Sequence, residues 1–202
     1  MVKSADFNEL IALPKGLTIP QLRKAIEYIE REAGGLVDLY IEQANVFSAL
    51  VGILGTRALD QVSGYEKHKN IHTAQQQFPD LVRRGSGPKP KPVDCLESKA
   101  SKRPWAIQSH YNHAGWYIVW RYLVDTTESF EGTKPVLVWR VDIVFFEEDD
   151  WTYEGSTASE GAGGRTHTFG IKKAAKRLQG TAVYQRSDVQ LKGGKPVPKN
   201  GD

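Results

Sequence analysis

Residues 78–82 (FPDLV) and 93–100 (VDCLESKA) decide the expected fold of this chain. Both stretches have the apolar content of short strands, and the residues between them are rich in glycine, proline and basic side chains, so we expect two strands joined by a loop. Because side chains alternate along a strand, Glu97 and Lys99 should point to the same face. The pairing of the two strands would then place Asp80 opposite this Glu-x-Lys pair.

Two carboxylates and one ammonium group would meet at this point of the hairpin. Magnesium is usually held by one or two carboxylates, while water and substrate phosphate fill the rest of its octahedral shell. Such an ion polarises a phosphoryl oxygen and lowers the pKa of bound water, and a charged lysine beside it stabilises negative charge on the phosphate. We therefore expect Asp80, Glu97 and Lys99 to be catalytic residues of a Mg²⁺-dependent phosphodiester hydrolase.

The spacing of these residues resembles that of the PD-(D/E)XK nuclease superfamily, to which most type II restriction endonucleases belong. The resemblance covers residues 78–100 and, more loosely, the overall layout. It implies an α/β (mixed α+β) fold with a restriction-endonuclease-like mixed β-sheet flanked by helices. It also implies double-stranded DNA as substrate, Asp80, Glu97 and the Ser98 carbonyl as metal ligands, and Lys99 as the group that orients the attacking water. Some members add an acid from an N-terminal helix, and Glu42 is the candidate for that role.

Three other interpretations of the same residues stay open. A surface hairpin with a solvated Glu/Lys pair would explain the motif without any activity. The chain could also be a structure-specific or repair nuclease of the same superfamily, or a non-catalytic nucleic-acid-binding module. For a restriction endonuclease we expect a homodimer, because a chain of 202 residues would cover about half of a short palindromic site.

Length and composition favour a single globular domain over residues 1–190, followed by a flexible basic tail over 191–202. Apolar residues make up 40% of the chain and charged residues 25%, which is ordinary for a globular protein. The single cysteine, Cys95, excludes an internal disulfide and a zinc site built on several thiolates. The sequence has no long apolar run and no signal-peptide pattern, so we expect a cytoplasmic protein without a membrane partner.

Basic residues are concentrated towards the C-terminus. Residues 161–202 contain nine basic and two acidic residues, a net charge of +7, which leaves −4 for the rest of the chain. This distribution suits a protein that grips phosphates with one part and a metal ion with another, although a solvated tail explains it as well. His68 and His72 lack a third zinc ligand and are expected on a polar or DNA-contacting surface. The candidate DNA-binding residues are Arg83, Arg84, Lys102, Arg103, Gln108, His110, Arg165, Lys172 and Lys173.

Local patterns predict the remaining elements. Thr18 and Gln21 form a capping box at the start of an amphipathic helix that ends near Gly34. A second helix is expected over 36–54, closed by Gly55. The other predictions are a loop over 84–92, two long and mostly buried strands over 116–124 and 136–146, an acidic turn over 147–150, a flexible loop over 155–166, a short basic helix over 171–178 and a final strand over 181–186.

Overall fold

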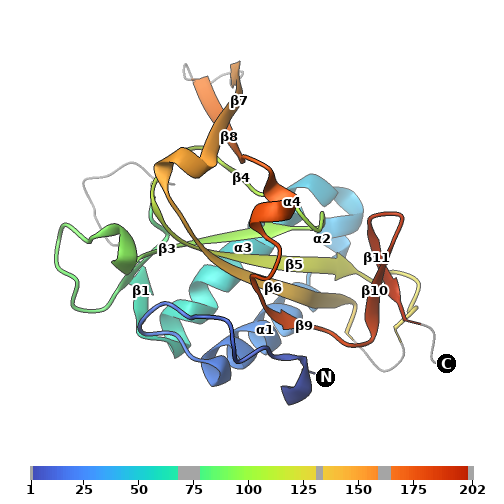
Figure 1. Ribbon diagram of the computed structural model, residues 1–202. Helices are drawn as coiled ribbons and strands as arrows, with labels where there is room; N and C mark the ends of the chain where they lie inside the picture. The colour runs from blue at the N-terminus through green and yellow to red at the C-terminus, as the bar shows by residue number, and fades with distance from the viewer. Residues whose placement is uncertain (1, 68–77, 131–133, 159–164, 200–202) are drawn as a thin grey trace.

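The computed structural model describes residues 2–67, 78–130, 134–158 and 165–199. The fold is mixed α/β and is built on a six-stranded sheet with the strand order β1-β2-β3-β5-β6-β9 (Figure 1). β3 and β5 run parallel, and the other neighbouring strands run antiparallel. The strands of this sheet are β1 (Tyr65–Lys67), β2 (Leu81–Arg83), β3 (Cys95–Ser101), β5 (Gly115–Val124), β6 (Val136–Phe146) and β9 (Ala182–Gln185).

The structure confirms the first predicted helix. α1 spans Ile19–Gly34, and the backbone N–H of Thr18 donates to Gln21 Oε1 at 2.9 Å, as the predicted capping box requires. Its apolar stripe is fully buried. This stripe packs on the second long helix and on β6, so α1 forms part of the layer that covers one face of the sheet.

The prediction of one helix over 36–54 is wrong in two respects, because the segment forms two helices and the second helix does not end at Gly55. The structure has α2 (Val37–Glu42) and α3 (Ala44–Val62), which are separated at Gln43, and α3 runs straight through Gly55. A Cβ atom at Gly55 would lie only 2.2 Å from Nε1 of Trp120. Glycine at this position therefore allows the helix to approach the sheet closely and does not terminate the helix.

The structure confirms the two long and mostly buried strands, and it shows that they are neighbours in the sheet. β5 and β6 pair antiparallel over most of their length, with one register shift. Alternation along β5 sends Ile118 and Trp120 into the core formed with α1 and α3, whereas Tyr117 and Val119 enter a second core on the opposite face. The apolar residues of this strand therefore contribute to two separate hydrophobic cores, one on each face of the sheet.

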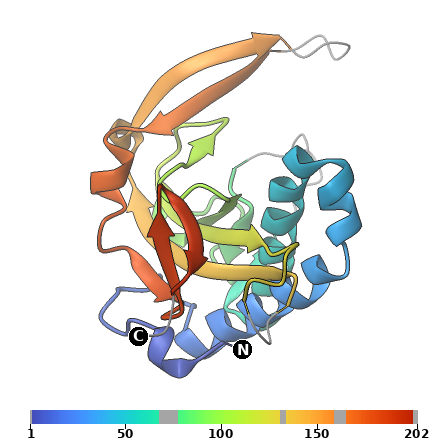
Figure 2. The same cartoon turned by 90° about the vertical axis from the view of Figure 1, so that its right-hand side faces the viewer.

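The two faces of the sheet are covered differently (Figure 2). α1 and α3 cover one face. The other face packs against a three-stranded sheet of order β4-β8-β7 and the short helix α4 (Ala174–Arg177), so the expectation of helices on both faces is met only by this single turn. The strands of this second sheet are β4 (Gln108–Ser109), β7 (Trp151–Ala158) and β8 (Arg165–Ile171).

Two segments expected to lack regular structure form hairpins. β7 and β8 pair antiparallel and project from the body of the molecule, so the expected loop over 155–166 is wrong for 155–158 and 165–166, and 159–164 lie outside the described residues (Figure 1). β10 (Val189–Lys192) pairs with β11 (Lys195–Pro198) where a flexible tail was expected. Within the described residues, no helix has the length and apolar character needed to cross a membrane.

Candidate active site

The pairing of β2 with β3 brings Asp80 next to Glu97. Leu81 lies opposite Leu96 in the register, so Asp80, one residue before β2, falls beside Glu97. The backbone N–H of Asp80 donates to Glu97 Oε2 at 3.0 Å. The backbone N–H of Ser98 donates in turn to Asp80 Oδ2 at 2.9 Å. The hairpin thus holds two carboxylates in place through main-chain donors from the opposite strand.

Lys99 joins the same site. Its Nζ lies 2.6 Å from Glu97 Oε1, as expected for two residues that share a face of a strand. The side chain of Glu97 is only 7% exposed, and that of Lys99 is 25% exposed. The three residues predicted to be catalytic therefore form one contiguous, largely buried cluster with two acids and one base.

The surplus of acid in this cluster is costly without a further cation. Burial, and then the neighbouring Glu97 carboxylate, raise the pKa of Asp80 to about 6, although Lys99 and the Ser98 N–H act in the opposite direction. Burial and the same two carboxylates also raise the pKa of Tyr117, whose hydroxyl donates to the His113 carbonyl at 3.0 Å. A bound cation would relieve the repulsion between Asp80 and Glu97.

The main chain of Ser98 faces the same place. Within the described residues the only residues of β3 that pair with β2 are Cys95 and Leu96, so this edge of β3 has no strand partner from Glu97 onwards. In a strand, the N–H and C=O of one residue point to the same side. Because the Ser98 N–H donates to Asp80, the Ser98 carbonyl lies on this open edge as well. Two carboxylates and one carbonyl form an all-oxygen donor set, which fits Mg²⁺ with water in its remaining positions.

The Ser98 side chain fixes this part of β3 from the opposite face. Its hydroxyl donates to the Gly52 carbonyl of α3 at 3.2 Å and accepts from Nε1 of Trp120 at 2.9 Å. Glu42, the candidate accessory acid, is exposed at the end of α2. Among the described residues, no three His, Cys, Asp or Glu side chains gather as a metal-binding group, so Glu42 does not join Asp80 and Glu97.

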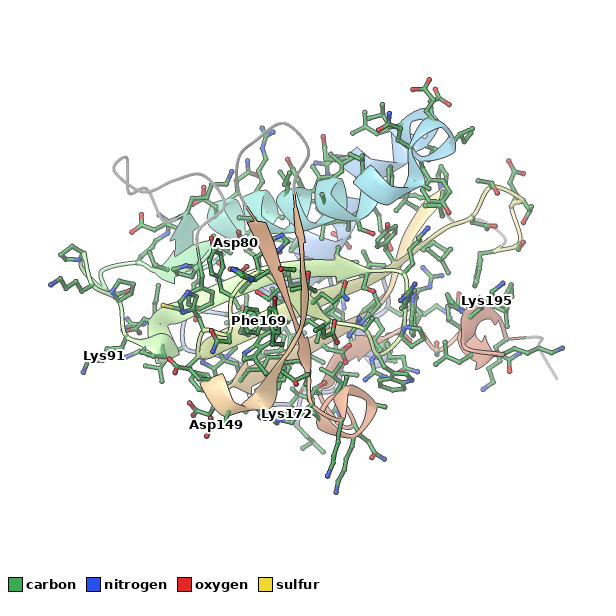
Figure 3. All side chains as sticks on the ribbon, turned by 90° about the horizontal axis from the view of Figure 1, so that it is seen from above. Asp80, Lys91, Asp149, Phe169, Lys172 and Lys195 are labelled. Atoms are coloured by element: carbon green, nitrogen blue, oxygen red, sulfur yellow. The ribbon has the colours of Figure 1, made fainter. Side chains whose placement is uncertain are left out.

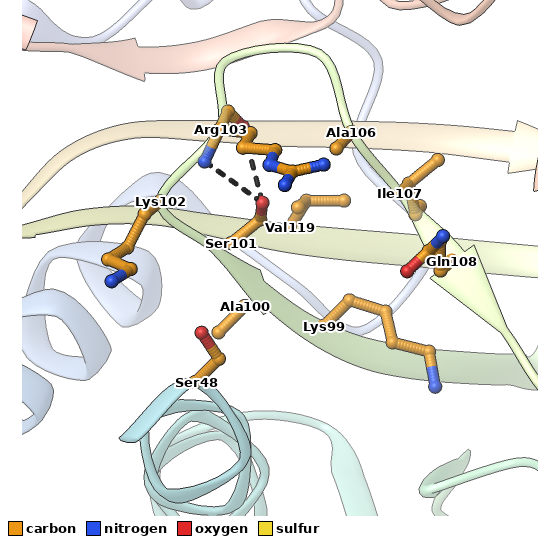
Figure 4. Close-up of a pocket in the computed structure, with 10 residues that line it drawn as sticks. All are labelled: Ser48, Lys99, Ala100, Ser101, Lys102, Arg103, Ala106, Ile107, Gln108 and Val119. Carbon is orange, nitrogen blue, oxygen red and sulfur yellow. Dashed lines mark hydrogen bonds between the residues drawn. The ribbon is translucent and has the colours of Figure 1, made fainter. Parts of the chain in front are cut away.

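A pocket of about 330 Å³ adjoins Lys99 at the end of β3 (Figure 4). Three of the predicted DNA-binding residues, Lys102, Arg103 and Gln108, line it. The pocket therefore joins part of the predicted DNA-binding surface to the Asp80–Glu97–Lys99 cluster. Its other lining residues are Ser48, Lys99, Ala100, Ser101, Ala106, Ile107 and Val119.

Two further basic candidates, Arg83 and Arg84, are held in ion pairs. Arg83 is paired with Asp94 at 2.7 Å, and Arg84 with Asp60 and Glu66, each at 3.2 Å. Arginines held by carboxylates in this way are less available to DNA phosphates. Figure 3 shows the C-terminal hairpin, labelled at Lys195, on the opposite side of the molecule from Asp80.

The remaining candidates lie near the second sheet. Nδ1 of His110 lies 3.2 Å from the His167 carbonyl. Lys172 Nζ donates to the Asp149 carbonyl at 2.7 Å, and Lys173 is exposed at the start of α4. Arg165 is the first residue of β8. The predictions for His68 and His72 fall outside the described residues.

Sequence reasoning missed a buried charge cluster on the same face of the sheet. Arg121 Nε donates to Asp142 Oδ2 at 3.0 Å, and Arg140 Nε donates to Asp142 Oδ1 at 2.8 Å. All three residues are buried. The sequence could have indicated this cluster, because charged residues of opposite sign interrupt two otherwise apolar strands.

The Asp80–Glu97–Lys99 cluster and the adjoining pocket are the features of the described residues that bear most directly on function. No family model, no curated protein and no solved structure matches this chain.

Proposed function

We propose that this chain is a Mg²⁺-dependent endodeoxyribonuclease of the PD-(D/E)XK type, most similar to a type II restriction endonuclease. The observation that carries the proposal is the convergence of Asp80, Glu97 and Lys99 on the open edge of β3. A solvated surface pair would not bury Glu97 to this extent or tie it to the main chain of a second strand.

Each residue has a distinct role in the proposed site. Asp80, Glu97 and the Ser98 carbonyl would hold the metal ion. When bound, Mg²⁺ polarises a phosphoryl oxygen and lowers the pKa of the attacking water. Lys99, 25% exposed and bordering the pocket, can donate to that water or to a non-bridging phosphate oxygen. The surrounding main-chain donors keep the carboxylates oriented before substrate binds.

The fold is compatible with this assignment. A hairpin carries both acids, and its second strand pairs parallel to a central strand of a mixed sheet. We propose that this is a restriction-endonuclease-like core and that the active form is a homodimer, in which each protomer cuts one strand of double-stranded DNA.

The direct test is to incubate the purified protein with plasmid and phage DNA in Mg²⁺ and in EDTA. Discrete Mg²⁺-dependent fragments are expected from the wild type. Asp80→Ala, Glu97→Ala and Lys99→Ala should abolish cleavage while folding and DNA binding persist. Lys24→Ala, at an exposed position of α1 on the far face of the sheet, is the matched control and should cut normally.

The alternatives predict different results in the same experiment. A smear in place of discrete fragments would indicate a structure-specific or repair nuclease. Binding without cleavage, steeply dependent on salt and independent of Mg²⁺, would indicate a non-catalytic module. Cleavage by all three site variants would contradict the proposed active site.

A further inference from the structure

The pocket beside Lys99 has the composition of a site for a sugar and a phosphate. Lys99, Lys102 and Arg103 line it, and none of its ten lining residues carries a carboxylate. Nζ of Lys99 is paired with Glu97, and Nζ of Lys102 lies 4.9 Å from the centre of the Tyr40 ring, from which it would turn to reach a phosphate. Small apolar side chains form much of the remaining wall, including those of Ala106 and Val119 (Figure 4). Cations suit a phosphate, and the apolar wall suits the face of a sugar ring.

The wall of this pocket is held in place from the core. Arg121 is fully buried, and its Nη1 donates to the carbonyls of Arg103 and Ala106. Asp142 orients Arg121 through Nε, and Arg140 stacks over the Trp105 ring with its guanidinium carbon 4.7 Å from the ring centroid. The segment from Lys102 to Gln108 is thus anchored at several points, so the pocket is formed before any ligand binds.

The distance between the pocket and the proposed catalytic cluster indicates which part of a DNA strand the pocket would bind. Lys99 belongs to both, and Ser101 lies two residues further along the same face of β3, a rise of about 7 Å. This distance is comparable with the separation of successive phosphates along one strand of DNA.

We propose that the pocket binds the phosphodiester and sugar next to the cleaved bond on the same DNA strand, with Lys102 and Arg103 contacting that single phosphate. The inference rests on the proposed function for the identity of the cleaved bond. It adds a substrate-positioning site that is separate from the metal ligands.

The test measures binding of a fluorescent DNA duplex in EDTA, where no cleavage occurs, by anisotropy over a range of salt concentrations. Lys102→Ala and Arg103→Ala should each weaken binding about 10-fold but reduce the slope of log K against log salt by less than one, because the other cation still contacts the phosphate. Arg103→Lys should retain most of the affinity. Lys24→Ala removes one exposed lysine from α1 and should leave both quantities unchanged.

The double variant tests whether both cations hold one phosphate. Loss of Lys102 and Arg103 together should reduce the slope by about one in total, because the single phosphate contact is lost only when both cations are removed. A reduction by two would assign the residues to separate phosphates and overturn the single-site proposal.

A variant that changes shape without charge separates the pocket from general electrostatic attraction. Ala106→Leu should fill the pocket and weaken binding about as much as Arg103→Ala does. Unchanged binding by Ala106→Leu would overturn the proposal. Circular dichroism and thermal melting of each variant verify the fold.

Kinetics distinguish failure of this inference from failure of the proposed function. If the wild type cleaves, the pocket variants should raise KM and leave kcat nearly unchanged, because they act on a non-reacting phosphate. Cleavage with wild-type KM in all pocket variants would overturn the pocket alone. Weakened binding in these variants, together with a wild type that never cleaves, would support a phosphate-binding pocket and refute the nuclease.

Discussion

Two buried charge clusters lie on the same face of the same sheet, and they are built in opposite ways. In the first, Asp142 lies between Arg121 and Arg140, and both of its oxygens accept hydrogen bonds from arginine. In the second, Asp80 and Glu97 share one ammonium group, that of Lys99. The first cluster has surplus positive charge and the second has surplus negative charge.

The two clusters differ in how their surplus charge is compensated. Arg121 and Arg140 direct further N–H groups to main-chain carbonyls, namely those of Arg103, Ala106 and Leu178, although Nη2 of Arg121 has no hydrogen-bond partner among the described residues. The surplus carboxylate at Asp80 keeps a raised pKa, and the cluster opens through Lys99 to a pocket. A buried group left in an unfavourable state beside a cavity is typical of a site that acts on a ligand. We therefore expect a structural role for the first cluster, and the second remains the site that we propose to be catalytic.

The largest expected effect is on catalysis. Glu97→Gln keeps the shape of the side chain but removes a charge from the proposed metal site, so DNA cleavage should fall at least about 1,000-fold, or about 4 kcal/mol in activation free energy. The midpoint of urea unfolding should change little. Single-turnover cleavage assays and denaturation of the same preparation check both parts. Cleavage by Glu97→Gln at the wild-type rate would contradict a catalytic role for the Asp80–Glu97–Lys99 cluster.

The equivalent change in the structural cluster should affect stability. Asp142→Asn leaves Arg121 and Arg140 as buried charges without an anionic partner, at a cost of about 3–5 kcal/mol in the free energy of unfolding. Glu32→Gln, which breaks the exposed pair with Arg31, is the control and should cost less than about 0.5 kcal/mol. Similar urea midpoints for the two variants would contradict a structural role for Asp142.

Removing the charge of Asp80 should increase the free energy of unfolding, the opposite of the effect expected at Asp142. The reason is that the charge of Asp80 is unfavourable in the metal-free protein. Its pKa rises from 3.8 to about 6 on folding, so the folded state binds the proton more tightly than the unfolded state. Metal-free stability should therefore fall as the pH rises from about 4 to about 6 and should stay lower above that. Asp80→Asn should remove this loss and stabilise the protein in EDTA at neutral pH by up to about 3 kcal/mol. Urea unfolding between pH 4 and pH 8 measures it, and a less stable variant at pH 7 would disprove the interpretation.

The smallest predicted effect separates the two sides of Ser98. Ser98→Ala removes the hydroxyl that faces α3 and leaves Nε1 of Trp120 without this acceptor, while the carbonyl on the open edge remains. The free energy of unfolding should fall by about 1–2 kcal/mol. Cleavage at saturating Mg²⁺ should stay within a few-fold of the wild type. A large loss of activity with unchanged stability would show that the hydroxyl itself serves the site.

The sequence was informative wherever the signal is local. A capping box of four residues placed the start of α1, and runs of apolar residues placed β5 and β6. The proximity of the three candidate residues could be predicted for the same reason. Alternation along one strand and a short connection between two strands suffice to bring Asp80 beside Glu97 and Lys99.

Tertiary structure decided the features that depend on residues distant in the chain. Only the Trp120 indole explains why α3 passes through Gly55, and only the fold shows that Arg83 and Arg84 are occupied by carboxylates. The pairing of β7 with β8 and of β10 with β11 overrode sequences rich in glycine and charge. The pocket likewise needs segments from α3, β3 and β5 together with the 102–108 segment. Local patterns determine which face a side chain takes, whereas long-range packing determines which partner it meets there.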